Sequence, residues 1–253
     1  MVGPALDLDV VRATPGTAVS RVSTKAPVHL ELADGTFLDV WIKGYFGAGW
    51  SARRAGIPEA SFYRDLALTS GIRTLGSVYA AIDPESQANV VITQDVLGQG
   101  AQFLDSLSDY TPDQMAESLS QLAVLHSATW LRPEYAKLGW LASRFDRYTV
   151  NRGVQQRGPS LVDVGYHIAS ALSIDDRRRH EFDLVRHYVE RLAHSGGAIA
   201  NAKSMQHELC LGIVHGFYLW GITLKVEPAM TAVLLRRLGT AADDHDVFGV
   251  LGL

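Results

Sequence analysis

Cysteine is almost absent from this chain, and so are long apolar runs. A single cysteine, Cys210, among 253 residues excludes an intramolecular disulfide and a thiolate zinc cluster. Its apolar neighbours predict a buried small side chain rather than a nucleophile. The best apolar window, residues 209–223, is shorter than a membrane span and is interrupted by His215. With no basic and apolar leader at the N-terminus, the sequence predicts a cytoplasmic protein that does not span a membrane.

The chain also lacks an excess of positive charge. It carries 23 lysine and arginine residues against 27 aspartate and glutamate residues, which gives a net charge of −4. The basic residues are scattered, so electrostatics give no reason to expect a nucleic-acid partner. The longest basic cluster, Arg177 to Arg179, is flanked by acidic residues and is interpreted as a solvated helix start. A hydrophobic fraction of 47% is enough for one or two globular units.

The first third of the chain has the pattern of an antiparallel sheet. Four segments have the alternation or β-branched composition of strands: residues 28–32, 37–42, 78–82 and 89–93. The first two are joined by Asp34 and Gly35, a turn typical of hairpins. Between the two pairs, residues 59–70 have helical periodicity, with Pro58 and Glu59 at the expected helix start.

The rest of the chain is predicted to be helical, which makes the fold class α+β. Thr111, Pro112 and Gln114 occupy the N-cap, first and third positions of a helix that runs to Trp130. Further helices are expected over residues 161–172, 173–195 and 204–219, and from residue 228 onwards. The helix of residues 173–195 carries Phe182, Val185, Val189 and Leu192 on one face.

The strongest chemical signal is a lysine at the end of a strand, followed by a glutamate in the next helix. Lys43 ends the apolar run of residues 38–42, and Glu59 stands at the predicted helix start. In kinases such a lysine binds nucleotide phosphates, and the glutamate holds the lysine in place. The alternative interpretation is that Lys43 is only an exposed lysine at a strand end, and that Glu59 is only a glutamate favoured at a helix start by the helix dipole. The order of the elements leaves both interpretations open.

Two further segments stand where a nucleotide-binding fold contacts its ligand. The small residues around Gly16 precede the hairpin, where a loop covering the phosphates would lie, although a surface turn has the same composition. Thr93, Gln94 and Asp95 stand at the end of the last predicted strand, where an adenine would hydrogen-bond to backbone groups of a linker. An ordinary exit from a strand into a loop gives the same pattern.

Four motifs stand in the first half of the chain: Trp-Ile-Lys at 41–43, Glu-Ala-Ser-Phe-Tyr at 59–63, Val-Ile-Thr-Gln-Asp at 91–95 and Leu-Ala-Val-Leu-His at 122–126. With the segments at 157–166, 215–220 and 241–245 they extend over most of the chain. Together they resemble the aminoglycoside-phosphotransferase superfamily, in particular its ecdysteroid-kinase-like and choline-kinase-like small-molecule kinases. The resemblance implies a protein-kinase-like fold of two lobes: a small antiparallel-sheet N-lobe over residues 1–95 and a mostly helical, truncated C-lobe over residues 96–253. It also implies ATP and Mg²⁺ as cofactors, and a small-molecule phosphate acceptor that the sequence does not identify.

The resemblance stops at the catalytic centre. Members of the family carry a His-Gly-Asp-x-x-x-x-Asn loop and then an aspartate-led, metal-binding strand, and the block that should hold both is missing between Arg144 and Arg157. Asp146 and Asn151 have the spacing of the loop. No His-Gly precedes them and no metal-binding aspartate follows, so we interpret the match as chance. No catalytic or metal-binding residue is therefore assigned.

The missing carboxylates predict an impaired enzyme, because phosphoryl transfer depends on positioned metal ions and on charge stabilisation. Two alternatives are a non-catalytic nucleotide-binding or scaffold pseudokinase, and a truncated kinase variant with no independent activity. The same deletion would expose apolar helix faces of the C-lobe, which predicts self-association through that surface.

Overall fold

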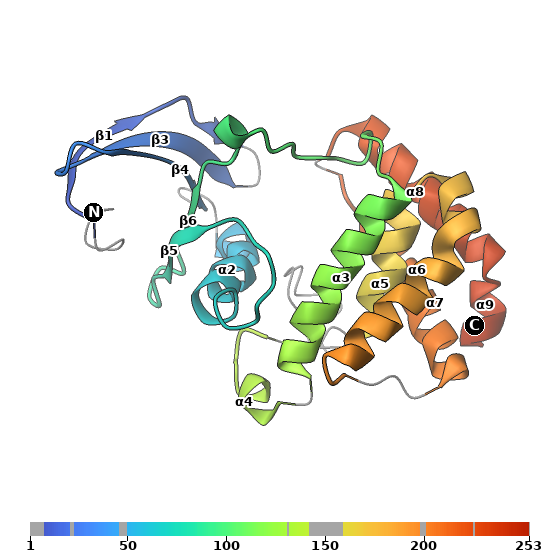
Figure 1. The fold of residues 1–253 in the computed structure, drawn as a ribbon. Helices are drawn as coiled ribbons and strands as arrows, with labels where there is room; N and C mark the ends of the chain where they lie inside the picture. The colour runs from blue at the N-terminus through green and yellow to red at the C-terminus, as the bar shows by residue number, and fades with distance from the viewer. Residues whose placement is uncertain are drawn as a thin grey trace. The chain divides into compact units, whose positions relative to one another are not determined.

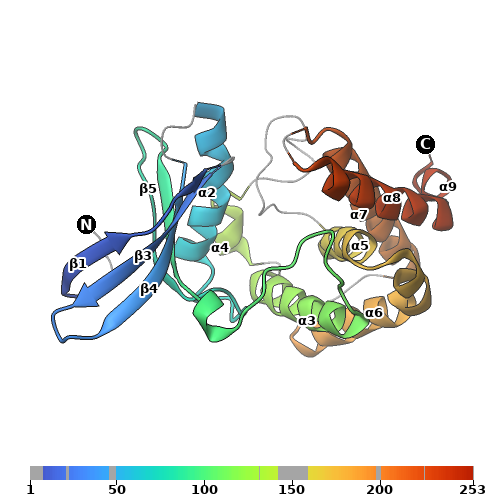
Figure 2. The ribbon, with the colours of Figure 1, turned by 90° about the horizontal axis from the view of Figure 1, so that it is seen from above.

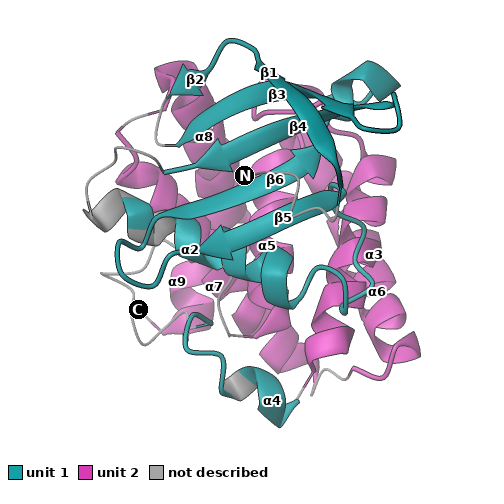
Figure 3. Ribbon diagram, turned by 90° about the vertical axis from the view of Figure 1, so that its left-hand side faces the viewer, with its two compact units in different colours: residues 1–102, 132–157 teal, residues 103–131, 158–253 magenta. Residues whose placement is uncertain are grey.

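The computed structural model of the chain describes residues 8–20, 23–45, 50–130, 132–141, 159–197, 201–224 and 226–252. The described residues form an α+β fold with a six-stranded antiparallel sheet and eight α-helices. The chain divides into two compact units (Figure 3): unit 1 comprises residues 1–102 and 132–157, and unit 2 comprises residues 103–131 and 158–253. The α+β class is confirmed, whereas the assignment of kinase lobes and their boundary at residue 95 stay predictions.

Unit 1 is built on the sheet (Figure 1). Its strands are β1 (Val10–Pro15), β2 (Val19–Ser20), β3 (Thr24–Leu32), β4 (Phe37–Gly44), β5 (Ser77–Ile82) and β6 (Asn89–Gln94). Their order across the sheet is β1-β3-β4-β6-β5, with β2 paired to β3 and every neighbouring pair antiparallel. The four strands expected from the sequence are present, and β4 lies in the middle of the sheet.

The β3–β4 hairpin turns at Asp34 and Gly35, as the sequence predicts. Gly35 has a φ of +82°, a left-handed conformation that favours a residue without Cβ. Asp34 accepts hydrogen bonds from the hydroxyl and the N–H of Thr36 at 2.6 and 2.9 Å, and these bonds lower the pKa of its carboxyl. The turn sets a register that places Val28 opposite Val40, and both belong to the buried cluster of the sheet.

Helix α2 (Trp50–Asp65) lies along one face of the sheet, against β5 and β6 (Figure 2). The prediction that this helix begins at Pro58 is wrong, because it begins eight residues earlier and Pro58 lies inside it. Proline has no N–H to donate to the preceding turn, so here it removes one helical hydrogen bond without marking the helix start. The helix also ends at Asp65 and not at Ser70. Trp140 Nε1 donates to the Asp65 carboxylate at 2.7 Å, so residues 132–141 contact the end of α2.

Most of the described helices belong to unit 2. They are α3 (Pro112–Thr129), α5 (Ser160–Ala171), α6 (Ile174–His194), α7 (Ala202–Gly221), α8 (Pro228–Asp244) and α9 (Val247–Leu251), while α4 (Pro133–Ala136) belongs to unit 1. The predicted start of α3 is confirmed: the Thr111 hydroxyl accepts from the Gln114 N–H, and the Gln114 side chain accepts from the Thr111 N–H. The predicted end of α6 is confirmed by Gly196, whose φ is +90°.

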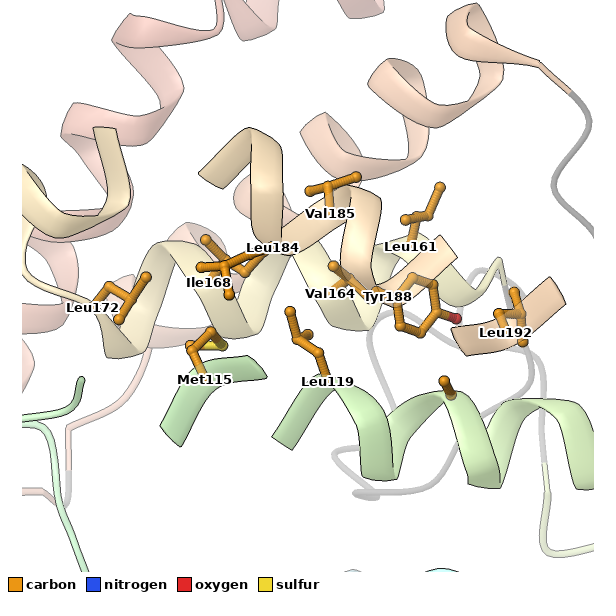
Figure 4. Packing of buried hydrophobic residues seen from close by; sticks show 11 residues of the cluster. Met115, Leu119, Leu161, Val164, Ile168, Leu172, Leu184, Val185, Tyr188 and Leu192 are labelled. Carbon is orange, nitrogen blue, oxygen red and sulfur yellow. The ribbon is translucent and has the colours of Figure 1, made fainter. Parts of the chain in front are cut away.

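Helices α3, α5 and α6 enclose the larger core of unit 2 (Figure 4). Its labelled members are Met115, Leu119, Leu161, Val164, Ile168, Leu172, Leu184, Val185, Tyr188 and Leu192. A second buried cluster joins α5, α7, α8 and α9 around Cys210 and Ile213. Cys210 is fully buried as predicted, and burial raises the pKa of its thiol. Because α5 contributes to both clusters, it is the central helix of unit 2.

The buried face of α6 holds Val185, Val189 and Leu192 as predicted, but Phe182 and Arg177 differ from the prediction. Phe182 is 77% exposed, whereas Arg177, which the sequence places in a solvated helix start, is 2% exposed. The Arg177 guanidinium donates to Glu181 at 3.0 Å and also to Asp244 of α8. Arg178 donates to the same Asp244 carboxylate at 2.8 and 3.0 Å. A partner from a distant helix therefore allows the buried charge, and nothing in the local sequence indicates it.

Helices α5 and α7 touch through their backbones. A Cβ added at Gly212 of α7 would lie 2.2 Å from the carbonyl oxygen of Val162. A Cβ added at Gly165 of α5 would lie 2.5 Å from the carbonyl oxygen of Leu209. Any side chain at either glycine would push the two helices apart.

We expect Gly212→Ala to lower the free energy of unfolding by about 1–3 kcal/mol, because overpacking forces the helices to separate. Urea denaturation measures the change. Gly221→Ala is the matched control at the end of the same helix, since a Cβ there meets nothing within 4 Å. The control should be neutral or stabilising by up to about 1 kcal/mol. Equal losses in both variants would show that the close approach does not limit stability.

The stability of the α6–α8 contact should depend on pH. Arg178 and Arg177 lower the pKa of Asp244 to about 2. A carboxylate whose pKa is lowered in the folded state stabilises the fold above its unfolded pKa, near 3.9, and loses that contribution as the pH falls through about 2. Asp244→Asn should therefore cost on the order of 1–3 kcal/mol at neutral pH.

Urea unfolding between about pH 4 and 2 should show this difference between wild type and Asp244→Asn shrinking. Asp183→Asn, which breaks an exposed pair with Arg186, is the control and should cost less than about 1 kcal/mol. A difference that persists unchanged to pH 2 would contradict the role of the Asp244 charge.

Candidate functional site

Lys43 and Glu59 form an ion pair within unit 1. Lys43 is the second-last residue of β4, and its Nζ donates to the two carboxylate oxygens of Glu59 at 2.8 and 2.5 Å. The two side chains are 28% and 27% exposed, so the pair is shielded in part and still reachable from solvent. Glu59 lies nine residues after the start of α2, so the dipole at a helix start does not explain its position. The two residues thus form an ion pair, and the role of this pair in binding nucleotide phosphates stays a prediction.

The charge of Glu59 acts on two neighbouring tyrosines. Burial raises the pKa of Tyr45 and of Tyr63, and the negative charge of Glu59 raises both further. Tyr45 also lies against α2 at Gly56, where an added Cβ would be 2.3 Å from the tyrosine ring. The absence of a side chain at Gly56 thus lets α2 lie close to Tyr45 and to Asn89 of β6.

Lys43 shares its face of the sheet with an aromatic residue. Side chains alternate along a strand, so Trp41 and Lys43 point to the same side of β4. The register places Trp41 opposite Pro27 and Lys43 opposite Lys25 on β3. On this face an apolar ring and an ammonium therefore stand side by side, a combination that suits a ligand with a flat apolar part and an anionic part.

Gly16 lies in the connection between β1 and β2. Its N–H donates to the carbonyl oxygen of Pro27 at 2.8 Å, and an added Cβ would lie 2.9 Å from the Pro27 ring. The connection thus leaves the sheet beside β3. Its role as a loop over phosphates stays a prediction.

The predicted linker begins later than expected. Thr93 and Gln94 belong to β6, because the ladder continues until Gln94 pairs with Val40 of β4, and Asp95 follows directly. The N–H of Gln94 donates to Gly76 at 2.8 Å, and the N–H of Asp95 donates to the Asp39 carbonyl at 2.9 Å. These two N–H groups are engaged within unit 1, so the predicted contact of this segment with an adenine would need other backbone groups.

The weak catalytic candidates Asp146 and Asn151 lie outside the described residues. Among the residues that are described, no group of three or more histidine, cysteine, aspartate or glutamate side chains could hold a metal ion. In the same part of the chain, no helix combines the length and the apolar character needed to cross a membrane.

Sequence reasoning missed a partly buried polar cluster in unit 2. Nδ1 of His126 is hydrogen-bonded to the Tyr188 hydroxyl at 2.8 Å, and its Nε2 lies 3.5 Å from the Asp163 carboxylate. Tyr188 is fully buried, and burial raises the pKa of its hydroxyl far above the ordinary value. Asp163 lies in the first turn of α5. The cluster joins α3, α5 and α6, and the 62 residues between His126 and Tyr188 leave no local signal for it.

The chain matches no protein-family model and no curated protein sequence. The assignment of a function therefore depends on the residues and contacts of unit 1.

A double-mutant cycle should detect the Lys43–Glu59 pair. Lys43→Met leaves a partly buried carboxylate without its cation and should cost on the order of 1–3 kcal/mol. Glu59→Gln should cost less in the Lys43→Met background than in wild type, with a coupling energy above about 0.5 kcal/mol. Urea denaturation of the four proteins gives the coupling. The exposed pair of Arg186 and Asp183 is the control, and an equal coupling there would contradict a special role for the first pair.

Proposed function

We propose that the chain is a kinase-like protein of the aminoglycoside-phosphotransferase superfamily that binds ATP through unit 1 and has little or no phosphotransferase turnover. The observation that carries this proposal is the ion pair between Lys43 and Glu59, with its Nζ–oxygen distances of 2.8 and 2.5 Å. In protein kinases, a lysine on a central strand contacts the α- and β-phosphates and is held by a glutamate of the following helix.

The topology of unit 1 supports the same interpretation. The lysine strand β4 lies between β3 and β6, and α2, which carries the glutamate, occurs in the connection from β4 to β5. Two strands that precede the lysine strand, β1 and β3, are joined through the segment that holds Gly16. A small antiparallel sheet with one long helix is what the family resemblance implies for an N-lobe, and the helices of unit 2 are what it implies for a C-lobe.

The residues around Lys43 fit a nucleotide phosphate. An ammonium has three donors, and the bond to Glu59 leaves Lys43 partly exposed, so a phosphate oxygen can approach it. Glu59 would orient Lys43, and Trp41 on the same face offers an aromatic surface for stacking with a base. ATP would supply the phosphoryl group. In the described part of the chain, no acidic cluster offers ligands to Mg²⁺ beyond the phosphates of ATP itself.

Low turnover follows from the missing catalytic block. Removing one strong electrostatic donor from an active site already costs on the order of a hundred- to a thousandfold in rate. The loss of a base and of both metal anchors leaves binding as the function that unit 1 can still perform. The proposal does not name a phosphate acceptor. A truncated kinase variant without any function would differ from the proposed protein because it would not bind nucleotide.

Self-association through unit 2 remains part of the proposal. Large apolar side chains are exposed there, among them Phe103, Leu107, Phe182, Phe217, Leu224 and Phe248. Exposed apolar groups of this size favour contacts between molecules when they form a continuous patch.

ATP with Mg²⁺ should raise the melting temperature of the wild-type protein, because a ligand that binds only the folded state stabilises it by about 2.7 kcal/mol at a hundredfold excess over Kd. Lys43→Met should lose most of this shift. Lys203→Met, at an exposed position on α7 in unit 2, should keep it. A wild-type protein without any ATP-dependent shift, or a Lys43→Met variant with an undiminished one, would contradict the proposal. If the wild-type protein transfers phosphoryl groups efficiently and Lys43→Met abolishes this activity, the proposed impairment is contradicted. The proposed binding of nucleotide to the wild-type protein would still stand.

A further inference from the structure

The register of the β3–β4 hairpin brings two lysines together. Lys25 on β3 stands directly opposite Lys43 on β4. Side chains of directly opposite residues lie on the same face, with Cβ atoms about 4.5–5.5 Å apart. Four residues away along each strand, and on the same face, His29 stands opposite Asp39. The side chains of these two residues form a hydrogen bond of 2.6 Å. Facing side chains of this hairpin therefore do reach each other.

The lysine pair carries more positive charge than its surroundings neutralise. Glu59 pairs with Lys43, whereas Lys25 is exposed and makes no ion pair with any other described residue. Like charges directly opposite each other destabilise a sheet. The one carboxylate thus pairs with only one of the two ammonium groups, and an anion bound between them would relieve the repulsion.

The segment with Gly16 adjoins this pair. Val19 of β2 pairs with Lys25, and the Gly16 N–H donates to Pro27, two residues further along β3. The connection expected to cover phosphates therefore runs beside Lys25, so a ligand held by the two lysines would lie next to it.

We propose that Lys25 and Lys43 together form an anion site for the phosphates of a nucleoside di- or triphosphate, with Lys25 as a second phosphate-binding residue. This inference rests on the proposed nucleotide binding. Glu59 holds Lys43 in place, while Lys25 has a flexible four-carbon stem and can adjust to the ligand. A chain of two or three phosphates presents several anionic oxygens and can contact both ammonium groups at once, which a single carboxylate does less well.

Calorimetric titration of the full chain with three probes tests the proposal: ATP, inorganic tripolyphosphate and adenosine. Lys25→Met should weaken binding of ATP and of tripolyphosphate by about tenfold, the effect of losing one charge-assisted contact. Binding of adenosine, which has no phosphate, should not change. Lys25→Arg should restore most of the affinity because it keeps the charge, and Lys203→Met is the control that should match wild type.

Stability without ligand separates a binding defect from a folding defect. The melting temperature of Lys25→Met should equal or exceed that of wild type, because the substitution removes a repulsion. A Lys25→Met variant that folds and binds ATP and tripolyphosphate as wild type does would overturn the role of Lys25. If Lys43→Met still weakens ATP binding in that case, the proposed nucleotide binding stands.

The opposite failure has a different result. One such result is that Lys25→Met weakens the binding of tripolyphosphate, that ATP binds no more tightly than tripolyphosphate, and that adenosine does not bind. The anion site would then stand, and the proposed nucleotide function would be overturned. Failure of all three probes to bind wild type would overturn both proposals.

Discussion

The ion pair between Lys43 and Glu59 ties the middle strand of the sheet to helix α2, and the function proposed for unit 1 depends on it. Desolvation offsets much of the attraction in a partly buried pair, so its contribution to stability is modest. Its main effect is on position, because it holds an ammonium group on one face of the sheet at a defined place. The contact of Tyr45 with α2 at Gly56 supports the same geometry, since any side chain at that glycine would displace the helix. The site therefore depends on backbone approach as much as on charge.

Unit 2 uses its polar groups differently. The buried Arg177 holds α6 against α8 through Asp244, and His126 with Tyr188 joins α3 to α6. Buried networks of this kind specify one arrangement of helices, because every member must find its partner. The backbone contact between α5 and α7 adds a steric condition that excludes larger residues at Gly212. These polar contacts thus serve the packing of unit 2, whereas the ion pair on which the proposed site depends lies in unit 1.

Binding and turnover have different physical requirements in a kinase-like protein. Holding a nucleotide needs a cation for the phosphates and an apolar surface for the base, and in the proposed function Lys43 and Trp41 on one face of β4 would supply these. Turnover also needs carboxylates that hold metal ions and orient the acceptor. A chain that keeps the first set and lacks the second is expected to retain affinity while losing rate. The excess positive charge of the lysine pair is in keeping with a site that is completed by an anionic ligand.

Local chemistry determined a large part of the fold from the sequence alone. The hairpin turn at Asp34 and Gly35, the capping box at Thr111 and the glycine stop of α6 depend on contacts within a few residues, and all three were predicted. The start of α2 was not, because a proline can stand inside a helix that tertiary contacts support. Only the tertiary structure decided that Arg177 is buried and Phe182 exposed, since the partner Asp244 lies 67 residues from Arg177. It also decided that Glu59 meets Lys43 and that Lys25 faces it, because strand register and helix approach bring together residues that have no contact along the chain.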